Sequence, residues 1–169
     1  MIFTPDHCRA LASCGTKTNI EFYRCEFQDE GAAFVEASAA RQDETSGPAK
    51  LRFVLSLAFN DRNWALFLSQ HKLDSLDLWD IDLSEVSCRA VATAEVHFLT
   101  LERCGLEDGG AALVEAVRQG LGPKGLCFRC TPFDSSESSV VFVSALRGNT
   151  NLKRCELPRI YVHQIIQPL

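Results

Sequence analysis

The sequence lacks the apolar run of about 18 residues that a membrane-spanning helix requires. Near the N-terminus, Asp6 and His7 interrupt the apolar residues before a signal-peptide core could form. An excess of basic residues is also missing, because 17 Lys and Arg stand against 22 Asp and Glu and give a formal net charge of -5. Binding to nucleic-acid phosphates favours the opposite balance. We therefore expect a soluble, intracellular and cytoplasmic protein that binds neither membranes nor nucleic acid.

Cysteine is too scarce for a small disulfide scaffold, since the chain has 8 cysteines in 169 residues and such scaffolds contain about 8–10%. One spacing, Cys127-x-x-Cys130, invites a metal or redox role. A zinc site needs four ligands, however, and residues three apart in a strand point to opposite faces of the sheet. No second ligand pair is formed by the four histidines, which are His7, His71, His97 and His163. We expect mostly reduced thiols, no metal and no cofactor.

Motifs of the common enzyme classes are also missing. The sequence has no glycine-rich phosphate loop, no nucleophile elbow and no metalloprotease helix. Neighbouring carboxylates occur at Asp80 and Asp82 and at Glu107 and Asp108, but in strands and turns such pairs are typically solvated charges. We therefore expect a protein that is not an enzyme.

What the chain does contain is an internal duplication, which is the first sign of a repeat protein. Residues 24–37 read RCEFQDEGAAFVEA and residues 103–116 read RCGLEDGGAALVEA, so that nine of fourteen positions are identical. A weaker echo follows each copy, at Gly47-Pro48 and at Gly122-Pro123. The chain therefore looks like one block of three small units duplicated in tandem.

Each small unit carries a recurrent pattern of apolar residues. Val96, Leu99, Leu101, Cys104 and Leu106 stand in the order L-x-x-L-x-L-x-x-C-x-L, with valine in place of the first leucine. The same frame fits five other stretches of the chain. The ninth positions of the six units lie 23 to 31 residues apart and are Cys25, Ser56, Ile81, Cys104, Thr131 and Ile160. Six units in phase indicate a repeat architecture.

The spacing of apolar residues predicts strands followed by helices. In an L-x-L pair, the two apolar side chains point to one face of a short parallel strand and the intervening residue points to the other. Asp29 and Asp108 are expected to cap helices that are entered through Gly31 and Gly110. Residues 5–14 are expected to form the closing helix of an incomplete first unit. Apolar residues at helical spacing predict further helices in the segments 33–40, 64–68, 112–117 and 140–146.

These units, most clearly Leu99 to Val117, resemble the ribonuclease-inhibitor-like class of leucine-rich repeats. The resemblance extends from about Asp6 to Val162. It implies an α/β leucine-rich-repeat solenoid of curved, right-handed strand-helix repeats, with a parallel sheet on the concave face and helices on the convex face. We expect a single domain, 1–169, with a partial helix at 5–14 and six units at 17–46, 47–72, 73–95, 96–122, 123–151 and 152–169.

The resemblance also implies that a partner binds the concave face, at the strand positions that point away from the core. Acids and bases are balanced there, which argues against a target of extreme charge. Tyr23 and Trp79 stand out because aromatic residues dominate binding hot spots, although their rings could instead rest on neighbouring strands. The candidate partner-binding residues are Glu21, Tyr23, Arg24, Arg52, Asp77, Trp79, Asp80, Glu102, Arg103 and Arg129.

We therefore expect a non-catalytic scaffold for protein–protein interaction, with a protein partner on the concave face. The alternative is an enzyme, or a regulatory subunit of an enzyme complex, with chemistry around Asp77, Glu102 and Cys127. A strongly shifted pKa in a closed pocket would favour the alternative.

The C-terminal edge of the repeats is apolar and needs a cover. We expect residues Tyr161 to Ile166 to fold back as a short helix that ends before Pro168, which favours a monomer. The alternatives are a dimer through this edge and a longer chain that continues the repeats.

Cysteine also occupies repeat positions. We expect Cys25, Cys104 and Cys155 to pack in the core, because a buried thiol behaves as a small apolar group. The pattern makes no assignment for Cys8, Cys14 and Cys88.

Overall fold

The computed structural model describes residues 1–13, 19–40, 50–55, 59–108, 110–129 and 136–157. Its centre is a six-stranded sheet in the order β10-β9-β7-β5-β4-β2, in which all neighbouring strands are parallel. The chain is therefore an α/β protein with a mainly parallel sheet. The six strands are β2 (Asn19–Tyr23), β4 (Lys50–Val54), β5 (Leu73–Trp79), β7 (Val96–Glu102), β9 (Gly125–Arg129) and β10 (Arg154–Glu156).

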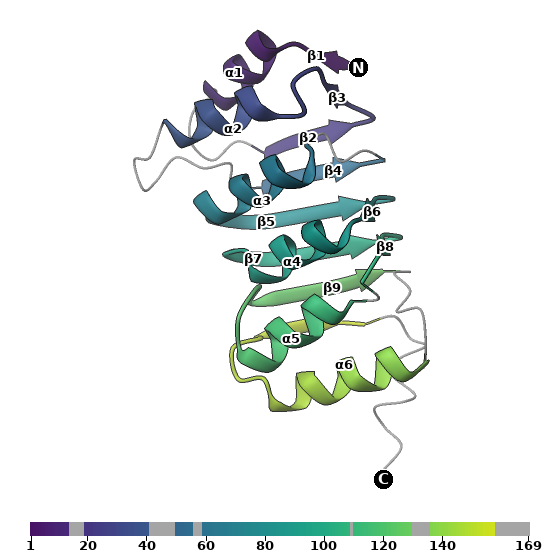
Figure 1. Cartoon of the computed structure of the whole chain (residues 1–169). Helices are drawn as coiled ribbons and strands as arrows, with labels where there is room; N and C mark the ends of the chain where they lie inside the picture. The colour runs from purple at the N-terminus through teal and green to yellow at the C-terminus, as the bar shows by residue number, and fades with distance from the viewer. Residues whose placement is uncertain (14–18, 41–49, 56–58, 109, 130–135, 158–169) are drawn as a thin grey trace.

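The helices of the described residues stack in chain order on one side of this sheet (Figure 1). Two short sheets connect successive units at the strand ends. In them, β1 (Ile2–Phe3) pairs with β3 (Glu26–Phe27), and β6 (Asp82–Leu83) pairs with β8 (Gly105–Leu106). The helices are α1 (Pro5–Ser13), α2 (Ala32–Ala39), α3 (Asp61–Gln70), α4 (Glu85–Thr93), α5 (Ala111–Gln119) and α6 (Ser136–Gly148).

Apolar residues at every second position of the strands form the core, as the L-x-L pattern predicts. Leu76 and Leu78 of β5 lie in register with Leu99 and Leu101 of β7, and all four are fully buried between sheet and helices. Asp77 lies between the two leucines of β5 and points to the opposite face, where it is partly exposed. Each buried leucine contributes about 1.5–3 kcal/mol, so the register is determined by this face of the sheet.

Aromatic side chains fill the N-terminal half of the core. The rings of Phe22 and Phe53 stack at a centroid distance of 5.0 Å, and Trp64 meets Phe53 edge-on at 5.2 Å. Phe59 leaves no room at Gly31, where an added Cβ would come within 1.8 Å of its ring. The position therefore requires glycine, and a left-handed φ of 88° gives the same requirement.

A residue with positive φ follows four of the strands and ends each of them. Its backbone N–H donates to the last carbonyl of the next strand, at 2.8 to 3.0 Å. This repeated turn directs the chain away from the sheet at an equivalent point after each of these four strands. The four residues are Arg24 (φ 48°), Leu55 (φ 60°), Asp80 (φ 53°) and Arg103 (φ 55°).

The duplicated segments form the same helix cap, which confirms the prediction for both aspartates. The carboxylate of Asp29 accepts hydrogen bonds from the N–H groups of Gly31 (3.2 Å) and Ala33 (2.7 Å) at the start of α2. Asp108 accepts from Gly110 and Ala112 at the start of α5, both at 2.8 Å. Two N–H groups that the helix leaves unpaired are thus satisfied in each copy.

Two elements were not expected from the sequence. Helix α4 is capped by Ser84, which accepts from the N–H of Ser87 (3.1 Å), and both hydroxyls donate to Asp61 of α3. The buried residues of α4 are Ser87, Cys88, Val91 and Ala92, and the sequence prediction did not include this helix. Strand β1 precedes the expected helix at 5–14, which α1 confirms, and takes the place of the short second strand of a unit.

The cysteine predictions have mixed outcomes. Cys25 and Cys104 are buried, as predicted, and the Cys104 thiol donates to the Leu78 carbonyl (3.3 Å). The prediction for Cys155 is wrong, because this side chain is exposed on β10, the last strand of the sheet. Cys8 and Cys88, which the pattern left open, are both buried.

Several predictions concern residues that lie outside the described part of the chain. These are the predicted helix at Tyr161–Ile166, the cysteines Cys14 and Cys130, and the ninth positions Ser56, Thr131 and Ile160. Within the described part of the chain, every helix is too short or too polar to cross a membrane.

Removing either aspartate cap will destabilise the fold. Asp29→Ala and Asp108→Ala should each lower the free energy of unfolding by about 1–2 kcal/mol, because each leaves two helix N–H groups without an acceptor. The double variant should lose the sum, since the two caps lie in separate units. Urea denaturation measures the change, and Glu36→Ala, which removes one exposed acid from α2, is the control. Equal stability of the cap variants and the control would contradict this account.

The stability of the fold should also depend on pH through His71. Its Nε2 lies 3.1 Å from the Ser38 hydroxyl, its ring packs against Phe67 at 4.6 Å, and burial lowers its pKa below the ordinary 6.5. The unfolded chain therefore takes up a proton before the folded protein does, and the free energy of unfolding falls as the pH drops below about 6.5. Denaturation curves at pH 7.5 and 5.5 should show a smaller difference in His71→Gln than in the wild type. An identical difference in the two proteins would refute the assignment to His71.

Candidate functional site

Parallel pairing brings equivalent residues of successive strands into rows on the sheet face opposite the helices, which we call the strand face. Its residues form three rows in register. The rows are Tyr23, Val54, Trp79, Glu102 and Arg129; then Glu21, Arg52, Asp77, Thr100, Cys127 and Glu156; and then Asn19, Lys50, Ser75, Phe98, Gly125 and Arg154.

The structure places seven of the ten candidate residues in these rows: Glu21, Tyr23, Arg52, Asp77, Trp79, Glu102 and Arg129. The prediction that the other three are strand positions is wrong. Arg24, Asp80 and Arg103 lie one residue beyond their strands, in the turns with positive φ. The left-handed turn ends each strand earlier than the alternation alone suggests.

Ion pairs between neighbouring strands connect the candidate residues. Lys50 contacts Asp77 at 3.0 Å, and Arg103 contacts Asp80 at 2.7 Å. Two further pairs are longer than a hydrogen bond. They are Arg52 with Glu21 at 3.6 Å and Arg129 with Glu102 at 3.7 Å. All of the basic side chains are at least 32% exposed, so each pair is worth about 0–1 kcal/mol and can exchange partners.

Arginine side chains also cover aromatic rings on the strand face. The Arg52 guanidinium lies 4.7 Å from the centre of the Trp79 ring, and that of Arg154 lies 5.2 Å from the centre of Phe98. Tyr23 is 55% exposed beside Arg24, whose guanidinium lies 5.6 Å from its ring. The rings of Tyr23 and Trp79 therefore differ, since one is open to solvent and the other is partly covered.

A hollow of about 340 Å³ lies at the centre of the strand face. Asp77 and Glu102 are the more shielded of its charged side chains, whereas Lys50, Arg52 and Arg129 are the more exposed ones. The lining residues are Lys50, Arg52, Ser75, Asp77, Leu78, Trp79, Phe98, Thr100, Glu102 and Arg129.

Three residues of this hollow were missed from the sequence: Lys50, Ser75 and Phe98. Each lies two residues before a residue that the L-x-L alternation places on the strand face: Lys50 before Arg52, Ser75 before Asp77, and Phe98 before Thr100, which lies between Leu99 and Leu101. The L-x-L frame covers only the end of each strand, whereas β4, β5 and β7 begin earlier. Extending the alternation by one step toward the N-terminus would have found them.

Cys127 is the thiol of the strand face, but it is only 1% exposed. Its Sγ donates to Oε2 of Glu156 at 3.4 Å. Burial and, next, this carboxylate raise the pKa of the Cys127 thiol above its ordinary value. The pKa of Glu156 is lowered, chiefly by its hydrogen bond with Arg154. A thiol with a raised pKa is a weak nucleophile, because the thiolate is the reactive form.

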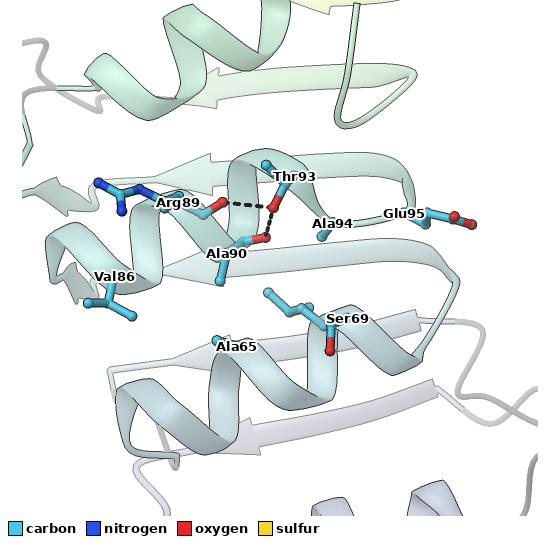
Figure 2. A pocket seen from close by; sticks show the side chains of 9 residues that line it. Ala65, Ser69, Val86, Arg89, Ala90, Thr93, Ala94 and Glu95 are labelled. Carbon is cyan, nitrogen blue, oxygen red and sulfur yellow. Dashed lines mark hydrogen bonds between the residues drawn. The ribbon is translucent and has the colours of Figure 1, made fainter.

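A second hollow, of about 450 Å³, lies on the helix side between α3 and α4 (Figure 2). Its walls are mostly small or apolar, with Ala65 from α3 and Val86 and Ala90 from α4. The Thr93 hydroxyl near one end donates back to the Arg89 carbonyl at 3.0 Å. The hollow therefore lacks the grouped charged and aromatic side chains of the strand face.

Thiol labelling tests the state of Cys127. At pH 8, iodoacetamide should modify Cys127 in the folded protein at least tenfold more slowly than a free cysteine peptide, because the thiol is buried and protonated. In 8 M urea the two rates should be similar. Mass spectrometry of the digested protein gives the rates. Rapid modification of folded Cys127 would contradict the buried, protonated state.

Neither a metal centre nor a relative explains the strand face. Among the described residues, no three His, Cys, Asp or Glu side chains are grouped closely enough to bind a metal ion. The geometry of the strand face is therefore the basis for a functional interpretation. Comparison of the chain with protein-family models, with curated proteins and with solved structures finds no match.

Proposed function

We propose that the chain is a leucine-rich-repeat solenoid whose strand face binds a protein partner without catalysing a reaction. The observation that carries this proposal is the concentration of aromatic and arginine side chains on the strand face, where Tyr23, Arg52, Trp79 and Arg129 lie on neighbouring or next-neighbouring strands. Aromatic residues and arginine are enriched in binding hot spots.

The repeat architecture is supported by features that recur once per unit. The turn residue with positive φ recurs at Arg24, Leu55, Asp80 and Arg103, at intervals of 23 to 31 residues. The aspartate caps at Asp29 and Asp108 recur with the duplicated sequence. A solenoid of such units obtains its stability from contacts between neighbours, which leaves the strand face available for binding.

The state of the candidate catalytic groups favours a scaffold over an enzyme. The Cys127 thiol is buried and its pKa is raised, which makes it a poor nucleophile. Asp77 and Glu102 are each paired with a basic side chain from a neighbouring strand.

Substitution of the two aromatic residues tests the binding surface. In pull-downs with the full chain as bait, Tyr23→Ala combined with Trp79→Ala should reduce recovery of the captured protein at least tenfold, as expected for hot-spot residues. The matched control is Leu66→Ala with Val86→Ala, which removes two exposed apolar side chains from the helix side. Recovery is quantified by mass spectrometry.

Both double variants must keep the wild-type unfolding midpoint in urea for the comparison to count. Loss of recovery only in the helix-side control, or equal recovery with all three proteins, would overturn the proposed site. Cross-links from the captured protein to the lysines near the sheet, such as Lys50, would place the partner independently.

A further inference from the structure

The hollow in the strand face offers more hydrogen-bond donors than acceptors to an occupant. Three basic side chains line it, namely Lys50, Arg52 and Arg129, against two acidic ones, whereas the whole chain carries a net charge of -5. The pairs that Arg52 and Arg129 make with acids have N–O distances of 3.6 and 3.7 Å, beyond hydrogen-bond length. Their guanidinium groups therefore have N–H donors to offer to a closer acceptor.

A second donor at the hollow is the indole of Trp79. Its Nε1 is shielded from solvent and has no hydrogen-bond partner among the described residues. A buried donor without a partner is unfavourable, and an occupant with an acceptor oxygen would satisfy it. The Arg52 guanidinium lies over the same ring, 4.7 Å from its centre, and both side chains line the hollow.

The two acidic side chains of the hollow do not make it a binding site for a cation. Asp77 already accepts from Lys50 at 3.0 Å and from the Ser75 hydroxyl at 3.1 Å. The side chains of Asp77 and Glu102 are 17% and 23% exposed, whereas that of Arg129 is 61% exposed. An approaching charge therefore meets the basic groups first, which attracts an anion and repels a cation.

We propose that the hollow receives the carboxylate of a Glu or Asp side chain from an acidic segment of the partner. This inference deepens the proposed function and rests on it. The carboxylate accepts from the guanidinium groups of Arg52 and Arg129, and Arg52 tilts toward it so that the Trp79 N–H becomes a further donor. Charge-assisted hydrogen bonds of this kind replace the long internal ion pairs with shorter ones.

Nuclear magnetic resonance of the indole groups tests the proposal directly. The chain has two tryptophans, so the 15N-labelled protein gives two indole N–H signals, and the Trp79→Phe variant assigns them. Trp64 is an internal control, because its indole is fully buried in the core and its Nε1 also has no partner among the described residues. The probes are the peptides acetyl-GELEG-amide, acetyl-GKLKG-amide and acetyl-GQLQG-amide.

The acidic peptide should shift the Trp79 signal in a saturable manner and leave the Trp64 signal in place. The lysine and glutamine peptides should bind at least tenfold more weakly. Arg52→Gln with Arg129→Gln should weaken binding of the acidic peptide at least tenfold, whereas Arg118→Gln should not change it. Arg118 is a matched control, because it forms an exposed ion pair with Glu115 on α5.

A fourth probe, the acidic peptide with both glutamates replaced by phosphoserine, is measured alongside the others. Three results would overturn the proposal: equal binding of the lysine peptide, no Trp79 shift with the acidic peptide, or tighter binding of this phosphoserine peptide than of the glutamate peptide. These failures are separate from failure of the proposed function. If pull-down still depends on Tyr23 and Trp79 while the acidic peptide does not bind, the strand face remains the partner site and only the acidic chemistry is refuted.

Discussion

Burial of every second strand residue against the helices is the interaction on which the other features depend. Leu51, Leu76, Leu99 and Leu126 stand in register on four neighbouring strands, and each has 0% exposure. A shift by one residue would turn these side chains to the strand face and bring charged residues into the core. The helix side of the sheet therefore determines the register, and the rows of the strand face follow from it.

The periodicity of apolar residues predicts most of the fold, because apolar residues mark the buried positions and their burial stabilises the fold. It predicts the strands of the six-stranded sheet and five of the six described helices, and the aspartates of the duplicated segment predict two helix starts. Helix α4 was not predicted: its buried residues are Ser87, Cys88, Val91 and Ala92, of which valine alone is a large aliphatic residue. The Ser84 and Ser87 bonds to Asp61 join residues that are distant in sequence.

The strand face is predictable in outline and not in detail. Alternation identifies which residues share a face, so Glu21, Arg52 and Asp77 could be grouped before their positions were known. Alternation gives no information on how deeply a side chain is buried or on how its pKa is shifted. Cys127 shares the row of these residues yet is buried under neighbours that include Glu156, and the raised pKa of its thiol comes from that enclosure. Such properties depend on contacts across strands, which residue types at fixed spacing do not determine.

The energetics of the two sides of the sheet differ in a way that suits binding. A buried leucine contributes about 1.5–3 kcal/mol, whereas an exposed ion pair such as Arg129 with Glu102 contributes about 0–1 kcal/mol. Breaking a strand-face pair to admit a partner therefore costs little, and the core keeps the backbone of the face in place during the exchange. The rows in register keep Trp79 and Arg129 within two strands of each other. Binding groups can thus change partners on a surface whose geometry is held by residues that the partner never touches.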